Sequence, residues 1–336
     1  MKNLIPFPIL LAALAACTNP LDTTLGQPGE VIIMNAQLST DQTRHFVLLS
    51  RGLVNAVEEL PDAQLDCYVN GEFAGRAREC RNELPQEYAE YVSQYGGTDV
   101  STRGNATQYV FDARIRPGDE LRLVASSGAL KASATVKGPQ PALLATVDTV
   151  SVPTSPYSVM YTSYGQEYTG ALVCRLRLVD RPGEQNWYRL GVDLESPQAR
   201  HSVRFGFDRD PVLNDGYKGS DAFDIGQFPR NAFCSFSDKQ FADGPADVEI
   251  HIIKDNIRHI RNQWVRDGSP ALRLRLLTLS LEEYTYLNAI NAAEIWGFNG
   301  AVLTEPVSFP SNVEGGLGLV SLASASDIIL AVPEFE

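Results

Sequence analysis

LRLRLLTL, residues 272–279, alternates apolar and polar side chains before it ends in a mostly apolar run. Because successive side chains of a β-strand point to opposite faces, this pattern predicts a strand with one buried face. Ser280 follows directly, and Glu283 lies three residues later, which is the capping-box pattern of a helix start. Apolar residues then recur at helical spacing, so we expect a helix near residues 281–294 that covers a sheet.

Similar strand-like stretches, separated by turns rich in Gly, Pro and Asn, occur along most of the chain. About seven short strands before residue 138 are typical of an immunoglobulin-like sandwich. The tyrosine-bearing residues 84–95 have helical spacing and predict a short helix inserted in a loop. We therefore predict a mainly β (β-rich α+β) fold, with an immunoglobulin-like β-sandwich over residues 30–138 and a second β-rich domain over residues 142–336 that has one covering helix. Gly138-Pro139-Gln140-Pro141 marks the boundary, because proline fixes φ and glycine interrupts a strand.

The first residues indicate where the protein is located. Residues 1–16 combine Lys2, an apolar run and small residues before Cys17, as a signal peptide does. The pattern resembles a bacterial lipobox, which implies cleavage before Cys17 and lipidation of its thiol. The apolar run is shorter than the ~20 residues that a transmembrane helix needs. The lipid on Cys17 would be the anchor instead, because acyl chains contribute ~0.8 kcal/mol of membrane-binding free energy per buried CH₂.

Residues 17–29 are polar and rich in Pro and Gly, so we interpret them as a lipidated tether. Thr18 rather than an Asp follows Cys17, which does not suggest retention in the inner membrane. We expect a lipid anchor in the outer membrane; whether the body faces the periplasm or the cell surface stays open.

The chain has a net charge of −13. Such an acidic chain is a poor partner for nucleic acid or anionic lipid. Four cysteines remain after Cys17, namely Cys67, Cys80, Cys174 and Cys234. An even number in an exported chain predicts two disulfides. Pairing within each domain favours Cys67–Cys80 and Cys174–Cys234, and four buried thiols are the alternative.

No catalytic motif is recognisable in the sequence. It contains neither a G-x-S-x-G elbow nor H-E-x-x-H, so we expect no enzyme and no obligatory cofactor. The strongest metal candidate is an acidic loop whose alternating oxygen ligands suit calcium. A turn capped by its own Asx side chains is the competing and favoured interpretation. The candidate ligands of this loop are Asp208, Asp210, Asn214 and Asp215.

Two further groups of residues are candidates for interaction. Tyr157, Tyr161, Tyr164 and Tyr168 lie in one stretch and would form a platform for a glycan or small ligand if their rings were exposed. Gly315, Gly316 and Gly318 permit a positive φ or a close backbone approach. They predict either a bulged strand at a domain seam, which we favour, or a rim that docks onto a partner.

The order of features in the second domain resembles a family of Bacteroidota lipoproteins, the domain-of-unknown-function family 4249. The stretches that carry this resemblance are residues 180–190 (DRPGEQNWYRL), 235–241 (SFSDKQF), 279–287 (LSLEEYTYL) and 305–318, which end in SNVEGGLG. The resemblance implies an outer-membrane lipoprotein encoded beside TonB-dependent transporters, and it supplies no catalytic residues. We therefore expect a non-catalytic binding or accessory partner of such a transporter, with a surface glycan-binding or adhesive lipoprotein as the alternative.

Overall fold

The computed structural model describes most of the chain between residues 29 and 332. The described ranges are 29–53, 56–80, 105–157, 159–162, 165–181, 183–196, 200–207, 209–214, 231–241, 244–264, 270–298 and 309–332. Cys17, the predicted signal peptide, the helix predicted over residues 84–95, Tyr164, Asp208 and Asp215 lie outside them.

The protein is mainly β, as the alternating patterns predict. Eleven strands form one sheet with the order β15-β14-β19-β21-β1-β2-β7-β6, to which β17, β20 and β3 attach at the side. These strands are β1 (Val31–Ser39), β2 (Arg44–Gly52), β3 (Val57–Glu59), β6 (Arg78–Cys80), β7 (Thr107–Asp112), β14 (Trp187–Glu195), β15 (Arg200–Ser202), β17 (Ser235–Ser237), β19 (Ala271–Leu279), β20 (Gly316–Leu317) and β21 (Val320–Ala331).

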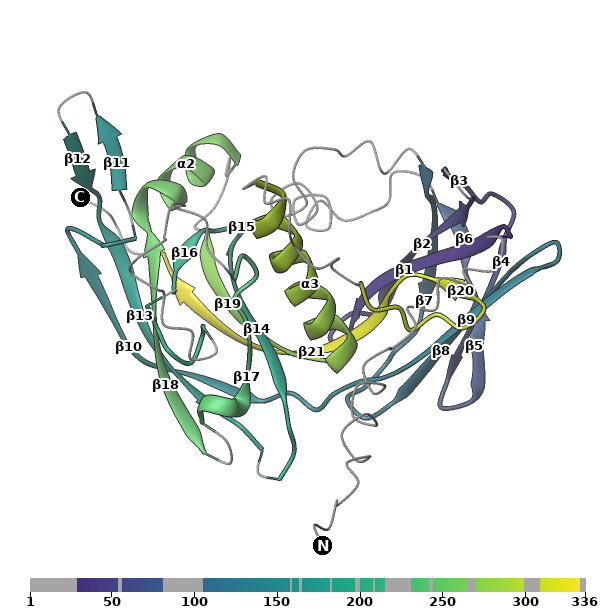
Figure 1. Ribbon diagram of the computed structural model, residues 1–336. Coiled ribbons are helices and arrows are strands. Elements are labelled where there is room, and N and C mark those ends of the chain that lie inside the picture. Colours follow the sequence, from purple (N-terminus) through teal and green to yellow (C-terminus); the bar gives the residue numbers. More distant parts are fainter. Residues whose placement is uncertain are drawn as a thin grey trace, which may run out of the picture.

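Two smaller sheets of four strands each accompany the large one. The first has the order β5-β4-β8-β9 and the second β10-β13-β18-β16, while a separate hairpin joins β11 to β12 (Figure 1). Their strands are β4 (Gln64–Val69), β5 (Glu72–Arg76), β8 (Glu120–Ser127), β9 (Leu130–Lys137), β10 (Leu143–Val152), β11 (Val159–Thr162), β12 (Gly165–Tyr168), β13 (Ala171–Val179), β16 (Phe205–Gly206) and β18 (Pro245–Ile253).

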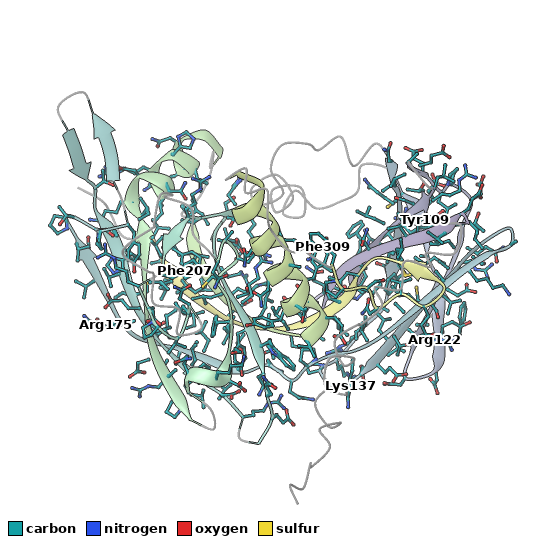
Figure 2. The ribbon with its side chains drawn as sticks, in the orientation of Figure 1. Tyr109, Arg122, Lys137, Arg175, Phe207 and Phe309 are labelled. Atoms are coloured by element: carbon teal, nitrogen blue, oxygen red, sulfur yellow. The ribbon has the colours of Figure 1, made fainter. Side chains whose placement is uncertain are left out.

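Both small sheets pack on the same face of the large sheet. Val320 and Leu322 of β21 belong to the N-terminal core, and Ile328 and Leu330 of the same strand pack on the C-terminal core. All four positions are even-numbered, so their side chains leave one face of the strand. The result is two sandwiches side by side on one shared sheet, with Tyr109 in the first core and Phe207 in the second (Figure 2).

The linker at residues 138–141 lies between the two cores in sequence, but Val313, Val320 and Leu322, which the prediction placed in the second domain, belong to the first core. The linker between them lies on the same face of the large sheet, where Ser324 Oγ of β21 donates to Pro139 O at 2.5 Å and Ala142 N donates to Thr278 Oγ1 of β19 at 3.1 Å. Gly138-Pro139-Gln140-Pro141 is therefore held against the large sheet.

The helix α3 (Leu281–Phe298) covers the opposite face of the large sheet. Its Leu287 packs with Leu279 and Ala323, whose odd-numbered positions point away from the two sandwiches. This is the predicted covering helix, and it lies over β21 in the middle of the molecule (Figure 1). A second helix, α2 (Lys254–Trp264), was not predicted. No helix within the described ranges is long and apolar enough to cross a membrane.

The N-terminal sandwich takes part of its structure from the end of the chain. The sheet order brings β20 and β21 beside β1, and Val313, Val320 and Leu322 complete its core. Arg275 of the second half also forms an ion pair with Asp41, at 3.1 Å. The two halves therefore have separate cores, but backbone pairing of β20 and β21 with β1 joins them in one sheet.

Candidate functional site

A group of interacting polar residues lies on the outer face of the sheet β10-β13-β18-β16. Val248, Ile250 and Ile252 of β18 point into the core, so Glu249 and His251 face outward. We call the six residues Ser155, Tyr157, Arg209, Asp210, Glu249 and His251 the outer-face cluster. They come from β18 and from the loops after β10 and after β16.

Three side chains of the cluster form a hydrogen-bonded chain. Ser155 Oγ lies 3.1 Å from His251 Nδ1, and His251 Nε2 lies 3.0 Å from Glu249 Oε1. Arg175 Nε donates to the other oxygen of Glu249 at 3.1 Å. The hydrogen bond from His251, followed by that from Arg175, lowers the pKa of Glu249.

A serine, a histidine and a carboxylate in this order are the components of a hydrolytic triad. Hydrolysis also requires that the hydroxyl can reach a substrate. Ser155 is only 1% exposed, and its Oγ also accepts the Tyr157 N–H at 3.3 Å. This geometry supports a hydroxyl that holds its own turn against β18 rather than a nucleophile presented to substrate.

Tyr157 was predicted as part of a ligand platform, but its ring packs within the protein. The ring centroid lies 4.8 Å from that of His251, and the Arg209 guanidinium lies 5.6 Å from its centroid. Its hydroxyl accepts the Arg209 N–H at 3.1 Å. Tyr161 and Tyr168 lie on the paired strands β11 and β12, and Tyr164 lies outside the described residues.

Asp210 is the aspartate of the predicted calcium loop that lies within the described ranges. Both oxygens of its carboxylate accept hydrogen bonds from backbone N–H groups. Oδ1 accepts from Val212 and Leu213 at 2.9 and 3.1 Å, and Oδ2 accepts from Glu249 at 2.9 Å. Asn214 N donates to the Asp210 carbonyl at 3.2 Å. This is the Asx-capped turn that the sequence analysis favoured. The described ranges contain no cluster of three or more His, Cys, Asp or Glu residues that could hold a metal.

The predicted disulfides are not formed. Cys67, Cys80, Cys174 and Cys234 are all buried, and none is joined to another. Cys67 lies on β4 of a small sheet, whereas Cys80 lies on β6 of the large sheet. Burial raises the pKa of the Cys67 and Cys174 thiols to about 12, which keeps them protonated. The alternative of buried thiols, which pack as small apolar groups, therefore applies.

Gly315, Gly316 and Gly318 form a seam with the N-terminal sandwich. A Cβ at these positions would lie 2.7, 2.4 and 2.1 Å from the carbonyl oxygens of Lys131, Ile32 and Met34 respectively. Gly315 and Gly318 also have φ values of 71° and 116°. The Asn312 side chain closes the block, since its amide donates to Val320 O at 2.7 Å and accepts from Val320 N at 2.9 Å. These contacts fit the seam of the favoured interpretation, but β20 and β21 keep one register against β1, so no bulge occurs between them.

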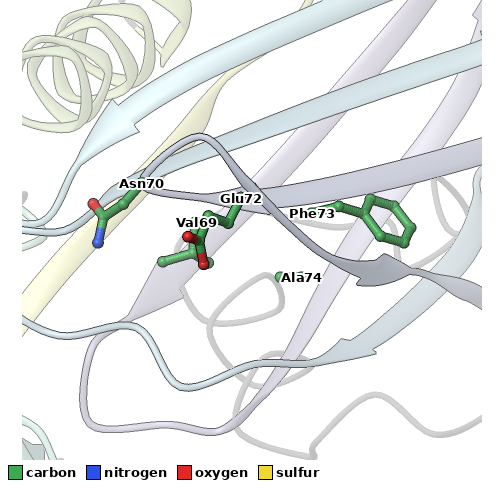
Figure 3. A pocket seen from close by; sticks show the side chains of 5 residues that line it. All are labelled: Val69, Asn70, Glu72, Phe73 and Ala74. Carbon is green, nitrogen blue, oxygen red and sulfur yellow. The ribbon is translucent and has the colours of Figure 1, made fainter.

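Two features were missed in the sequence. Glu283 of α3 is only 3% exposed and turns toward Arg189 and Ser321 instead of completing the capping box, although its N–H still donates to Ser280 Oγ at 3.3 Å. A surface hollow at the β4–β5 hairpin is lined by Val69, Asn70, Glu72, Phe73 and Ala74 (Figure 3). The Phe73 ring packs edge-on to Tyr68, and nothing there resembles a reactive centre.

The chain is similar in sequence to one protein family. A sequence model of one family, described as Domain of unknown function (DUF4249), matches residues 18–329. No curated protein matches the chain. The crystal structure of a "Putative membrane anchored protein" from Corynebacterium diphtheriae aligns over 91% of this chain and 61% of its own length, with 10% identity and a TM-score of 0.18. This chain thus spans less than two thirds of that protein, and the score is too low to indicate a shared fold.

Proposed function

We propose that this chain, which belongs to the DUF4249 family, is an outer-membrane lipoprotein that acts as a non-catalytic binding or accessory partner of a TonB-dependent transporter. In this role it would capture a ligand for the transporter or gate its pore. The outer-face cluster supports this class of function over catalysis, because its serine is buried and its carboxylates bind the protein's own groups.

The observation that carries the proposal is the short distance in sequence between the anchor and the folded body. Cys17 precedes Gly29, the first described residue, by twelve positions (29 − 17). Twelve extended residues span about 40 Å at most. A lipid on Cys17 would therefore keep both sandwiches close to the membrane surface, where a transporter presents its loops.

Affinity purification of the lipidated protein from gently solubilised envelopes tests this proposal. We expect a TonB-dependent transporter in near-equal amount, identified by mass spectrometry. The matched control is Cys17→Ser, which removes the lipidated thiol and should leave the protein in the soluble fraction. Recovery of the wild-type protein alone, in repeated extractions, would contradict the accessory role and favour independent ligand or glycan binding.

A further inference from the structure

Two buried aspartates meet where the turn after β13 contacts the segment after β17. Asp180 is 7% exposed and Asp238 is 4% exposed, and they come from two of the stretches that carry the family resemblance, DRPGEQNWYRL and SFSDKQF. The pairing of β17 with β14 brings these two stretches together at the side of the large sheet. We call residues 231–241, which contain β17 and the 3₁₀ helix Asp238–Gln240, the edge strap.

Asp180 is a hydrogen-bond acceptor whose second oxygen lacks a donor. Its Oδ1 accepts from the Tyr188 hydroxyl and from the Asn186 side-chain amide, the latter at 3.0 Å. Burial, followed by the hydrogen bond to Asp180, raises the pKa of Tyr188, so this hydroxyl stays protonated and donates. Asp180 Oδ2 is buried and has no hydrogen-bond partner among the described residues. Because buried polar atoms nearly always have a partner, one donor remains to be found at this oxygen.

The Asp238 carboxyl is the group placed to supply that donor. Its Oδ2 accepts the Asn186 N–H at 2.6 Å, which leaves its other oxygen to carry a proton. Burial raises the pKa of Asp238 above its usual range; the Asn186 N–H opposes this shift, whereas the charge of Asp180 and a hydrogen bond with Asp180 add to it. Two carboxyl groups in one buried site retain a proton between them, because like charges repel strongly there.

The surroundings of the two aspartates do not supply a cation in place of that proton. Neither aspartate forms an ion pair within the described part of the chain. Arg181, the cation whose charge acts on Tyr188, is paired with Glu184 at 3.2 Å. The rings of Phe236 and Phe241 pack on that of Tyr188, with centroids 5.5 and 6.2 Å away. Apolar walls of this kind strengthen the repulsion between two ionised carboxylates.

We propose that Asp180 and Asp238 share one proton, which Asp238 donates to Asp180 Oδ2, and that this hydrogen bond is a pH-sensitive latch that fastens the edge strap to the turn after β13. In acid the proton is present and the latch is closed. A proton that the folded state holds more tightly than the unfolded state stabilises the fold at low pH, and the stabilisation is lost as pH rises. The edge strap therefore loosens as pH rises. Its Ala232 N donates to Asn291 Oδ1 of α3 at 3.0 Å, so the loosening extends to the covering helix.

Hydrogen–deuterium exchange of the full chain between about pH 4 and pH 8, read by mass spectrometry and corrected for the intrinsic pH dependence of amide exchange, tests the latch. We expect exchange in the edge strap to accelerate about tenfold relative to β8 as pH rises, because one unit of raised pKa corresponds to a factor of ten. Asp238→Asn should abolish the acceleration, since its amide donates to Asp180 Oδ2 at every pH. Asp180→Asn should abolish it too, because only one carboxylate then remains. Glu283→Gln is the control at another buried carboxyl and should keep it.

The wild-type protein alone can overturn the latch, even if an asparagine variant fails to fold. Exchange in the edge strap that does not accelerate relative to β8 contradicts it directly. If Asp180→Asn keeps the acceleration, Asp238 titrates by itself and no proton is shared. If Glu283→Gln abolishes the acceleration, the loosening comes from the helix and not from the aspartates. If millimolar calcium suppresses the acceleration in wild type, a bound cation and not a proton bridges the two carboxylates.

Discussion

Gly318 is the residue at which the seam between the two ends of the chain is tightest. Its φ of 116° disfavours any side chain, and a Cβ there would lie 2.1 Å from Met34 O. The adjacent Leu319 N donates to Asn35 Oδ1 at 3.1 Å, so a side-chain hydrogen bond also holds the backbone beside β1. Neither β1 nor the loop before β21 can move away without losing these contacts.

We expect Gly318→Ala to lower the free energy of unfolding by about 3 kcal/mol, because backbone strain and overpacking add at this position. Urea denaturation of the full chain measures the change. Gly191→Ala is the matched control, since Gly191 lies within β14 and a Cβ there meets no atom within 4 Å. Equal midpoints for the two variants would show that the seam tolerates a side chain and is not tight.

At the same scale, the sequence indicates which residues matter more readily than what each one binds. The acidic loop was open to two interpretations, and the Glu249 N–H, 39 residues away, decides what Asp210 binds. The ring of Tyr157 is likewise packed against His251, a residue whose position beside it no local pattern encodes. The even number of cysteines predicted disulfides. That prediction was wrong because the number carries no information on which sheet each thiol occupies.

Among the elements, α3 was predictable because its signals are local. Ser280 and the apolar spacing that follows mark its start and its buried face, as the hydrogen bond from Glu283 N to Ser280 Oγ confirms. The helix α2 is amphipathic, with Ile257 and Ile260 buried on one face, but it was missed because few apolar residues stand out among its mostly polar ones. The side chain of Glu283 is the exception within α3, because burial under the helix overrides its expected capping role.

Glu283 should make the stability of the protein depend on pH. Burial raises its pKa above the ordinary value of 4.5, with Arg189 and then Ser321 opposing the shift. The folded state therefore holds more protons than the unfolded state between 4.5 and the raised pKa, and stability falls as pH rises through that interval. Glu283→Gln should flatten this decline, as measured by melting temperatures from pH 4 to 8. The matched control is Glu282→Gln, at an exposed neighbouring residue, which should keep the wild-type decline of melting temperature with pH. Parallel curves of melting temperature against pH for wild type and Glu283→Gln would show that Glu283 does not cause the decline.

For the molecule as a whole, two β-rich halves were predictable but their joining was not. Each half contains its own alternating strands, and Gly138-Pro139-Gln140-Pro141 separates them. The pairing of Ala36 with Val320 and of Leu38 with Leu322 joins positions at opposite ends of the chain. A single sequence carries no periodic signal for pairing over such a separation, although the glycines of the seam indicated where an unusual backbone was needed.

The shared strand predicts that residues 30–138 are not an independent folding unit. Without residues 309–331, the N-terminal core lacks Val313, Val320 and Leu322, and β1 loses its pairing with β20 and β21. We expect the isolated fragment 30–138 to show no cooperative thermal transition and to bind a hydrophobic dye, because an uncovered core face and an open edge remain.

A synthetic peptide of residues 309–324 should restore the transition by re-forming the seam, and the same peptide with Gly318→Ala should restore it poorly. A sharp transition of the fragment alone would contradict this expectation and would mean that β21 is an addition to a self-sufficient sandwich.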